Sequence, residues 1–179
     1  MTMFQRLAHK TQGMLLIALL SSGAAVNASS GDAEAGQVKA ATCVACHGVD
    51  GNSAVPAFPK LAGLGHKYLL KQMQDIRDGR RPVALMAGQV DNMSDEDLSD
   101  IAAFYDAQPR SGGMSDPDKV ALGKKVYLAG IADRQVPACS GCHSPTGNGN
   151  SLAGYPSLGG QHAEYIASQL KMFRKGYED

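Results

Sequence analysis

All four cysteines of the chain lie in two copies of one short motif, Cys-x-x-Cys-His, at 43–47 and at 139–143. Two thiols separated by two residues on a helical turn can each add across one vinyl group of a porphyrin. The adjacent imidazole then lies beneath the ring, where it can bind the iron. The motifs therefore predict two covalently bound haem c groups, attached through Cys43, Cys46, Cys139 and Cys142 and ligated by His47 and His143.

Other uses of paired cysteines agree less well with the sequence. The two pairs lie 96 residues apart, whereas zinc-binding pairs are usually separated by about 15–20 residues. A thioredoxin-like dithiol requires a βαβ context, and no such pattern is present. A disulfide within each pair would leave the following His unexplained. Haem attachment is the favoured interpretation.

The chain also contains an internal repeat. The segment 59–63 recurs at 156–160, and Tyr68, Gln72, Arg77 and Gly79 recur as Tyr165, Gln169, Arg174 and Gly176. The offset is 96 residues at the cysteines and 97 afterwards, so one insertion separates the copies. A repeat of this kind predicts two units with the same fold. We expect domain 1 over 29–109, a linker over 110–115 and domain 2 over 116–179.

Both units are predicted to be helical. The apolar spacing and the capping residues indicate helices within 32–44, 68–76, 94–108, 117–127 and 163–173. Ser94 is the expected N-cap of the third helix, whose first turn is acidic, and Leu98, Ile101, Ala102 and Tyr105 form its apolar stripe. No strand pattern is evident, so the predicted fold is all-α. Two domains of this size have thin cores and normally need a cofactor or another staple.

Two prolines and one methionine are candidates for the surroundings of the irons. Pro59 and Pro156 follow the histidines by 12 and 13 positions, and their carbonyls could accept the free imidazole N–H; an ordinary loop turn also favours proline. A Met sulfur opposite His raises the reduction potential. Met86 lies in an irregular stretch and is the predicted sixth ligand of the first haem. Met73 is expected in a core, and Met93 beside the Ser94 cap.

The N-terminus is typical of an export signal. Arg6 and Lys10 precede the apolar run 14–20, and small residues at 26–28 suit cleavage before Ser29. The run is too short for a spanning helix, which needs about 20 residues. The sequence therefore predicts a cleaved signal peptide over 1–28 and a periplasmic protein. The formal net charge is zero, and no basic patch indicates nucleic acid.

The runs 46–53 (CHGVDGNS), 58–63 (FPKLAG) and 158–162 (LGGQH) resemble the cytochrome c4 family. The resemblance implies two class I cytochrome c domains related by pseudo-twofold symmetry, with haem propionates facing across their interface. It also implies transfer of single electrons from a quinol–cytochrome c reductase or another donor to a haem-copper terminal oxidase. Peripheral association with the membrane stays open. The family's thioether cysteines, proximal histidines and first distal methionine fall on Cys43, Cys46, Cys139, Cys142, His47, His143 and Met86.

One departure from the family concerns the second haem. The counterpart of Met86 projects to about position 183, beyond Asp179, so domain 2 is expected to be incomplete. Either the sequence is a fragment or haem two has an open or substituted sixth site, for which His162 and Met172 are the internal candidates. Two other functions remain under consideration. One is the dihaem subunit of a periplasmic oxidoreductase such as a sulfide-oxidising flavocytochrome, and the other is a haem enzyme such as a peroxidase.

The motifs predict two thioether-bound haems in each mature chain. Mass spectrometry of the exported protein should give the mass of the polypeptide from about Ser29 plus two haems, and denaturing electrophoresis should retain haem stain. A mass corresponding to one haem, or to bound zinc, would contradict the prediction.

Overall fold

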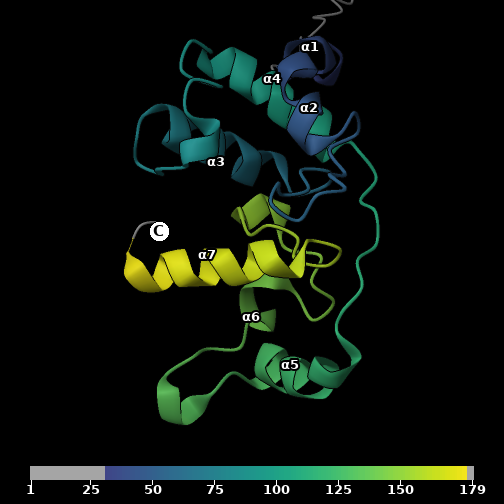
Figure 1. The fold of residues 1–179 in the computed structure, drawn as a ribbon, viewed down its shortest axis with the longest axis vertical. Coiled ribbons are helices and arrows are strands. Elements are labelled where there is room, and N and C mark those ends of the chain that lie inside the picture. The colour runs from purple at the N-terminus through teal and green to yellow at the C-terminus, as the bar shows by residue number, and fades with distance from the viewer. Residues whose placement is uncertain (1–30, 177–179) are drawn as a thin grey trace, which may run out of the picture.

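The computed structural model describes residues 31–176, which fold into two helical halves (Figure 1). The predicted signal peptide over 1–28 lies outside the described residues. Over 31–176 there is no β-strand, only two isolated bridges, so the all-α prediction is confirmed. None of the helices in this range is long and apolar enough to cross a membrane. The helices are α1 Ala33–Lys39, α2 Val44–His47, α3 His66–Arg77, α4 Asp95–Asp106, α5 Pro117–Ala129, α6 Ser140–His143 and α7 Ala163–Lys175.

The two halves are stacked along the long axis of the molecule. Figure 1 shows α1–α4 in one half and α5–α7 in the other, joined by an extended segment between α4 and α5. Helix α7 lies along the boundary, facing α3 of the other half. The loops that follow the two Cys-x-x-Cys-His motifs meet at this boundary, where Lys60 and Gln161 are hydrogen-bonded.

Capping residues define where several helices begin. The Ser94 hydroxyl accepts from the Asp97 N–H, and the Asp97 carboxylate accepts from the Ser94 N–H, which makes the predicted cap a full capping box. Asp116 caps α5, with Pro117 in its first turn. The helix expected over 32–44 is interrupted, because α1 ends at Lys39 and a 3-10 turn precedes α2. The interruption changes the direction of the chain between α1, which packs on α4, and α2, which carries the first motif.

Helix α4 is the centre of the first half. Its predicted apolar stripe is buried, with Leu98, Ile101, Ala102 and Tyr105 at most 1% exposed. Helix α1 crosses α4 at Gly36, where an added Cβ would overlap the Asp100 carbonyl. The Asp100 carboxylate accepts from the Asp32 N–H at 2.7 Å and from Lys39 Nζ at 2.6 Å. These hydrogen bonds hold the pKa of Asp100 below its ordinary value.

The second half packs more loosely over the described residues. Helices α5 and α7 contain no buried residue there, and Leu122 and Leu170 are more than half exposed. Tyr127 of α5 is held through its hydroxyl, which donates to the Ser144 carbonyl at 2.6 Å. This bond fixes α5 against the chain just after the second motif.

The close crossing at Gly36 generates a stability prediction. Gly36→Ala should lower the free energy of unfolding by about 1–3 kcal/mol, since α1 must move away from α4 to accommodate the methyl group. Urea unfolding of the oxidised holoprotein, followed by circular dichroism, measures the change. Gly141→Ala is the control, because its Cβ meets open space and the first motif has Ala45 at the equivalent position. Equal midpoints for Gly36→Ala and wild type would contradict the packing argument.

Candidate functional site

The two cysteine motifs adopt the same local structure. Cys43 and Cys139 are the N-caps of the single-turn helices α2 and α6, which end at His47 and His143. In each motif the first thiol is half-buried and the second exposed, and all four are free. The thiols are therefore available for covalent attachment of a cofactor.

The imidazole of His47 is buried and oriented. A hydrogen bond from Nδ1 to the Pro59 carbonyl oxygen, 2.8 Å away, holds the ring in place. A carbonyl only accepts, so Nδ1 bears the proton and Nε2 has a free lone pair. Burial lowers the pKa of His47, although the Pro59 hydrogen bond acts in the opposite direction. A neutral imidazole with an available Nε2 is the form that binds a metal.

His143 repeats this arrangement. Its Nδ1 lies 2.9 Å from the Pro156 carbonyl. Each imidazole also meets an aromatic ring edge-on: Phe58 is 6.4 Å from His47 and Tyr155 is 5.8 Å from His143 between ring centroids, both at 69°. The second imidazole is only half-buried, so the two sites share geometry but differ in exposure.

A glycine carbonyl fixes each proline loop. Gly51 O accepts from the N–H groups of Leu61 and Ala62 at 2.7 and 3.2 Å. Gly147 O accepts in the same way from Leu158 and Gly159 at 2.8 and 2.9 Å. Gly51 has φ +74°, and a Cβ there would strike the Tyr105 ring, so the position requires glycine. The loops hold the proline carbonyls over the imidazoles.

A cavity of about 380 Å³ lies beside the first motif. Its lining includes Cys43, Cys46, His47, Pro59 and Met86. The structure therefore brings the predicted site residues of domain 1 around one space. Among the alternatives, Met73 of α3 packs on the core and also contributes to the lining, whereas Met93 packs on the core and is not among the lining residues.

The loop that holds Met86 is tied to α3 at both ends. Met86 closes a 3-10 turn, Ala84–Met86. Before it, Arg80 Nε donates to the buried Asp75 carboxylate at 2.7 Å. After it, Arg77 Nη1 donates to the Met93 carbonyl at 3.2 Å and to Asp95 at 2.8 Å. These bonds keep both ends of the loop in place beside the cavity.

The residues present suit a haem c group. The cavity walls are mainly apolar and its volume is within the usual range for a ligand site, about 300–1,000 Å³. Gln72 Oε1, on the wall, is buried without a hydrogen-bond partner among residues 31–176. Two thiols can attach the porphyrin covalently, and a neutral imidazole and a thioether can bind its iron. In the same range no three His, Cys, Asp or Glu side chains converge as an ion site.

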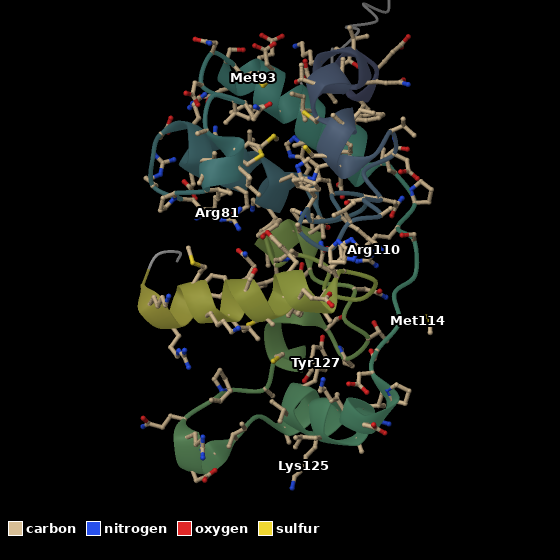
Figure 2. The ribbon with its side chains drawn as sticks, viewed as in Figure 1. Arg81, Met93, Arg110, Met114, Lys125 and Tyr127 are labelled. Carbon is tan, nitrogen blue, oxygen red and sulfur yellow. The ribbon has the colours of Figure 1, made fainter. Side chains whose placement is uncertain are left out.

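Contacts between the halves were missed by sequence reasoning. Arg81 donates to the Tyr165 hydroxyl at 3.1 Å and to Gln169 Oε1, and Figure 2 shows Arg81 on the side of its half that faces α7. Arg81 and Tyr165 both line the cavity. The repeat identified Tyr165 and Gln169 as recurring residues, but a repeat gives no information about partners across a boundary.

Comparisons with known proteins agree with this geometry. The family model "Cytochrome c" matches twice, over residues 33–106 and 120–179. Cytochrome c4 of Pseudomonas aeruginosa is 57% identical over 148 residues, which is 83% of this chain and 74% of that protein. A thiosulfate dehydrogenase electron acceptor of Stutzerimonas stutzeri is 35% identical, over 76% of this chain and 65% of that protein.

The fold is also that of a solved relative. The crystal structure of reduced recombinant cytochrome c4 from Pseudomonas stutzeri superposes with a TM-score of 0.81 at 54% identity, covering 83% of each chain. Two matches to one domain family, two equivalent imidazole sites and a structural similarity over 83% of each chain lead to one conclusion. The chain belongs to the cytochrome c4 family of dihaem electron carriers, and it binds two covalent haem c groups.

Proposed function

We propose that this protein is a periplasmic carrier that takes single electrons from a respiratory donor, such as a quinol–cytochrome c reductase, and passes them to a haem-copper terminal oxidase. The observation that carries the proposal is the cavity between His47 and Met86, whose lining extends to Tyr165 of the other half. A site that opens toward the second domain supports passage of an electron between two haems. Export would depend on the predicted signal peptide.

The cysteines are proposed to hold the haems. Each thiol S–H would add across one vinyl C=C, with sulfur bonded to one carbon and hydrogen to the other. Cys43 and Cys46 would attach haem one, and Cys139 and Cys142 haem two. Bound haem supplies a one-electron couple at its iron. Covalent attachment also compensates for the thin core of each small domain.

The histidines and Met86 are proposed to bind the irons. His47 and His143 would each use Nε2, because the Nδ1–H of each ring is already donated to a proline carbonyl. That second hydrogen bond fixes the ring orientation and raises the basicity of the ligand. Met86 would supply a second ligand to haem one, and apolar lining residues such as Leu69 would exclude water. Met/His ligation in an apolar pocket favours a high reduction potential.

A second candidate donor has a specific observation in its favour. The similarity to a thiosulfate dehydrogenase electron acceptor supports reduction by a sulfur-compound dehydrogenase, in place of a quinol-oxidising complex. The acceptor side of the proposal is the same for both donors.

The role as carrier is tested by reoxidation kinetics. The reduced holoprotein is mixed with membranes that contain a haem-copper oxidase, and the visible α-band is followed. We expect rapid, cyanide-sensitive oxidation of both haems. If the protein stays reduced while the same membranes oxidise another c-type cytochrome, the proposed acceptor is wrong. Addition of reductase and quinol, or of dehydrogenase and thiosulfate, then distinguishes the two donors.

Replacement of Met86 tests the ligand assignment. Met86→Ala should leave haem one attached but lower its potential by at least ~0.1 V, since axial ligands set haem potentials over a range of about 0.8 V. The ferric charge-transfer band at the red edge of the spectrum should weaken. Redox titration and absorption spectra measure both effects.

Met93→Leu is the matched control for this experiment, because Met93 packs on the core and does not line the cavity. It should retain the band and the potential. Loss of the band in Met93→Leu, with its retention in Met86→Ala, would show that the ligand has been misassigned.

A further inference from the structure

One side chain of the second half binds the backbone beside the first haem site. Gln161, two residues before α7, accepts the Lys60 N–H through Oε1 at 3.0 Å and donates from Nε2 to the Lys60 carbonyl at 2.8 Å. Lys60 is only 7% exposed, so water competes weakly for these bonds. Its Nζ is held by the linker, donating to Ser111 Oγ and the Gly112 carbonyl.

The Lys60 N–H belongs to the same peptide group as the Pro59 carbonyl. That carbonyl accepts from His47 Nδ1 at 2.8 Å. Hydrogen bonds in series polarise one another, so an acceptor on the N–H side makes the carbonyl of the same amide a stronger acceptor. Gln161, the Pro59–Lys60 peptide and His47 therefore form one polarised chain of hydrogen bonds across the boundary.

We propose that Gln161 is a positioning residue of the second domain that strengthens the His47–Pro59 hydrogen bond and thereby lowers the reduction potential of haem one. A stronger bond at Nδ1 makes the imidazole a more basic ligand, which stabilises ferric over ferrous iron. The inference rests on the proposed ligation of iron by His47.

The repeat supplies an internal comparison. At the offset of 97 the counterpart of Gln161 is Leu64, which has no polar side-chain atom. The peptide equivalent to Pro59–Lys60 is Pro156–Ser157, and no residue within 31–176 accepts from the Ser157 N–H. His143 thus donates to the Pro156 carbonyl, but no side chain of the other half accepts from the adjoining Ser157 N–H. The potential of haem two should therefore be insensitive to Gln161.

The test is Gln161→Leu, which installs the residue found at position 64, in the full exported holoprotein. Spectroelectrochemistry should show a higher potential for haem one, with a roughly threefold rise in its reduced-to-oxidised ratio at fixed ambient potential, the size expected for a weakened hydrogen bond. In NMR spectra of the reduced protein the His47 Nδ1–H should shift upfield and exchange faster. Haem two should not change.

His162→Leu is the matched control. The structure places His162, considered above for the second iron, with its Nε2 2.9 Å from the Ser53 carbonyl across the same boundary, so this nitrogen is already engaged. Its side chain makes no hydrogen bond to the Pro59–Lys60 peptide. It should leave the His47 Nδ1–H and the haem-one potential at wild-type values. If both variants shift haem one equally, the effect belongs to domain docking, and the proposal fails. It also fails if Gln161→Leu changes neither the haem-one potential nor the His47 Nδ1–H resonance.

A further variant, Gln161→Glu, tests the proposal if Gln161→Leu folds poorly. Gln161→Glu keeps an acceptor for the Lys60 N–H, so the His47 Nδ1–H should stay at or downfield of its wild-type position, and an upfield shift would overturn the proposal. The ligation itself is checked in the same spectra. If the His47 ring protons lack the large ring-current shift of a haem ligand, the proposed ligation is wrong; if they show it but do not respond to Gln161, only this inference fails.

Discussion

Each half of the molecule is organised around a hydrogen bond from an imidazole Nδ1–H to a proline carbonyl. Alone such a bond contributes only about 1 kcal/mol net, so it cannot arrange its own surroundings. Its geometry depends on Gly51 and Gly147, whose carbonyls each accept two N–H groups from the proline loop. The same hydrogen bonds are present in both halves, although the residues between the histidine and the proline differ between the two copies. This agreement indicates that the orientation of the imidazole is the constraint that both halves satisfy.

The surroundings of that bond differ between the halves. Around His47, α1 crosses α4 at Gly36 and the Met86 loop is tied to α3, and the imidazole is buried beside the cavity. Around His143 the described helices leave the imidazole half-buried. The boundary adds a further asymmetry, since Gln161 binds beside Pro59 while its counterpart is Leu64. The two copies of the unit thereby give their motif histidines different hydrogen-bonding surroundings at the boundary.

The structural features that the sequence predicted best are those determined by residues close together in the chain. The capping box at Ser94, the apolar stripe of α4 and the start of α7 follow from side-chain type and spacing. The pairing of each motif histidine with a proline carbonyl was expected from a short, repeated interval. The 3-10 turn before Cys43 was not foreseen, because it depends on how α1 packs against α4. The roles of Arg81 and Gln161 were also missed, since their partners belong to the other half and no periodicity encodes them.

A crystal structure of the haem-loaded protein tests the central claim most directly. The account predicts Nε2 of His47 and of His143 bonded to the two irons, with each Nδ1 still donating to Pro59 or Pro156 and with Met86 sulfur on the other side of haem one. An iron bound through Nδ1, or a histidine turned away from its proline carbonyl, would contradict it.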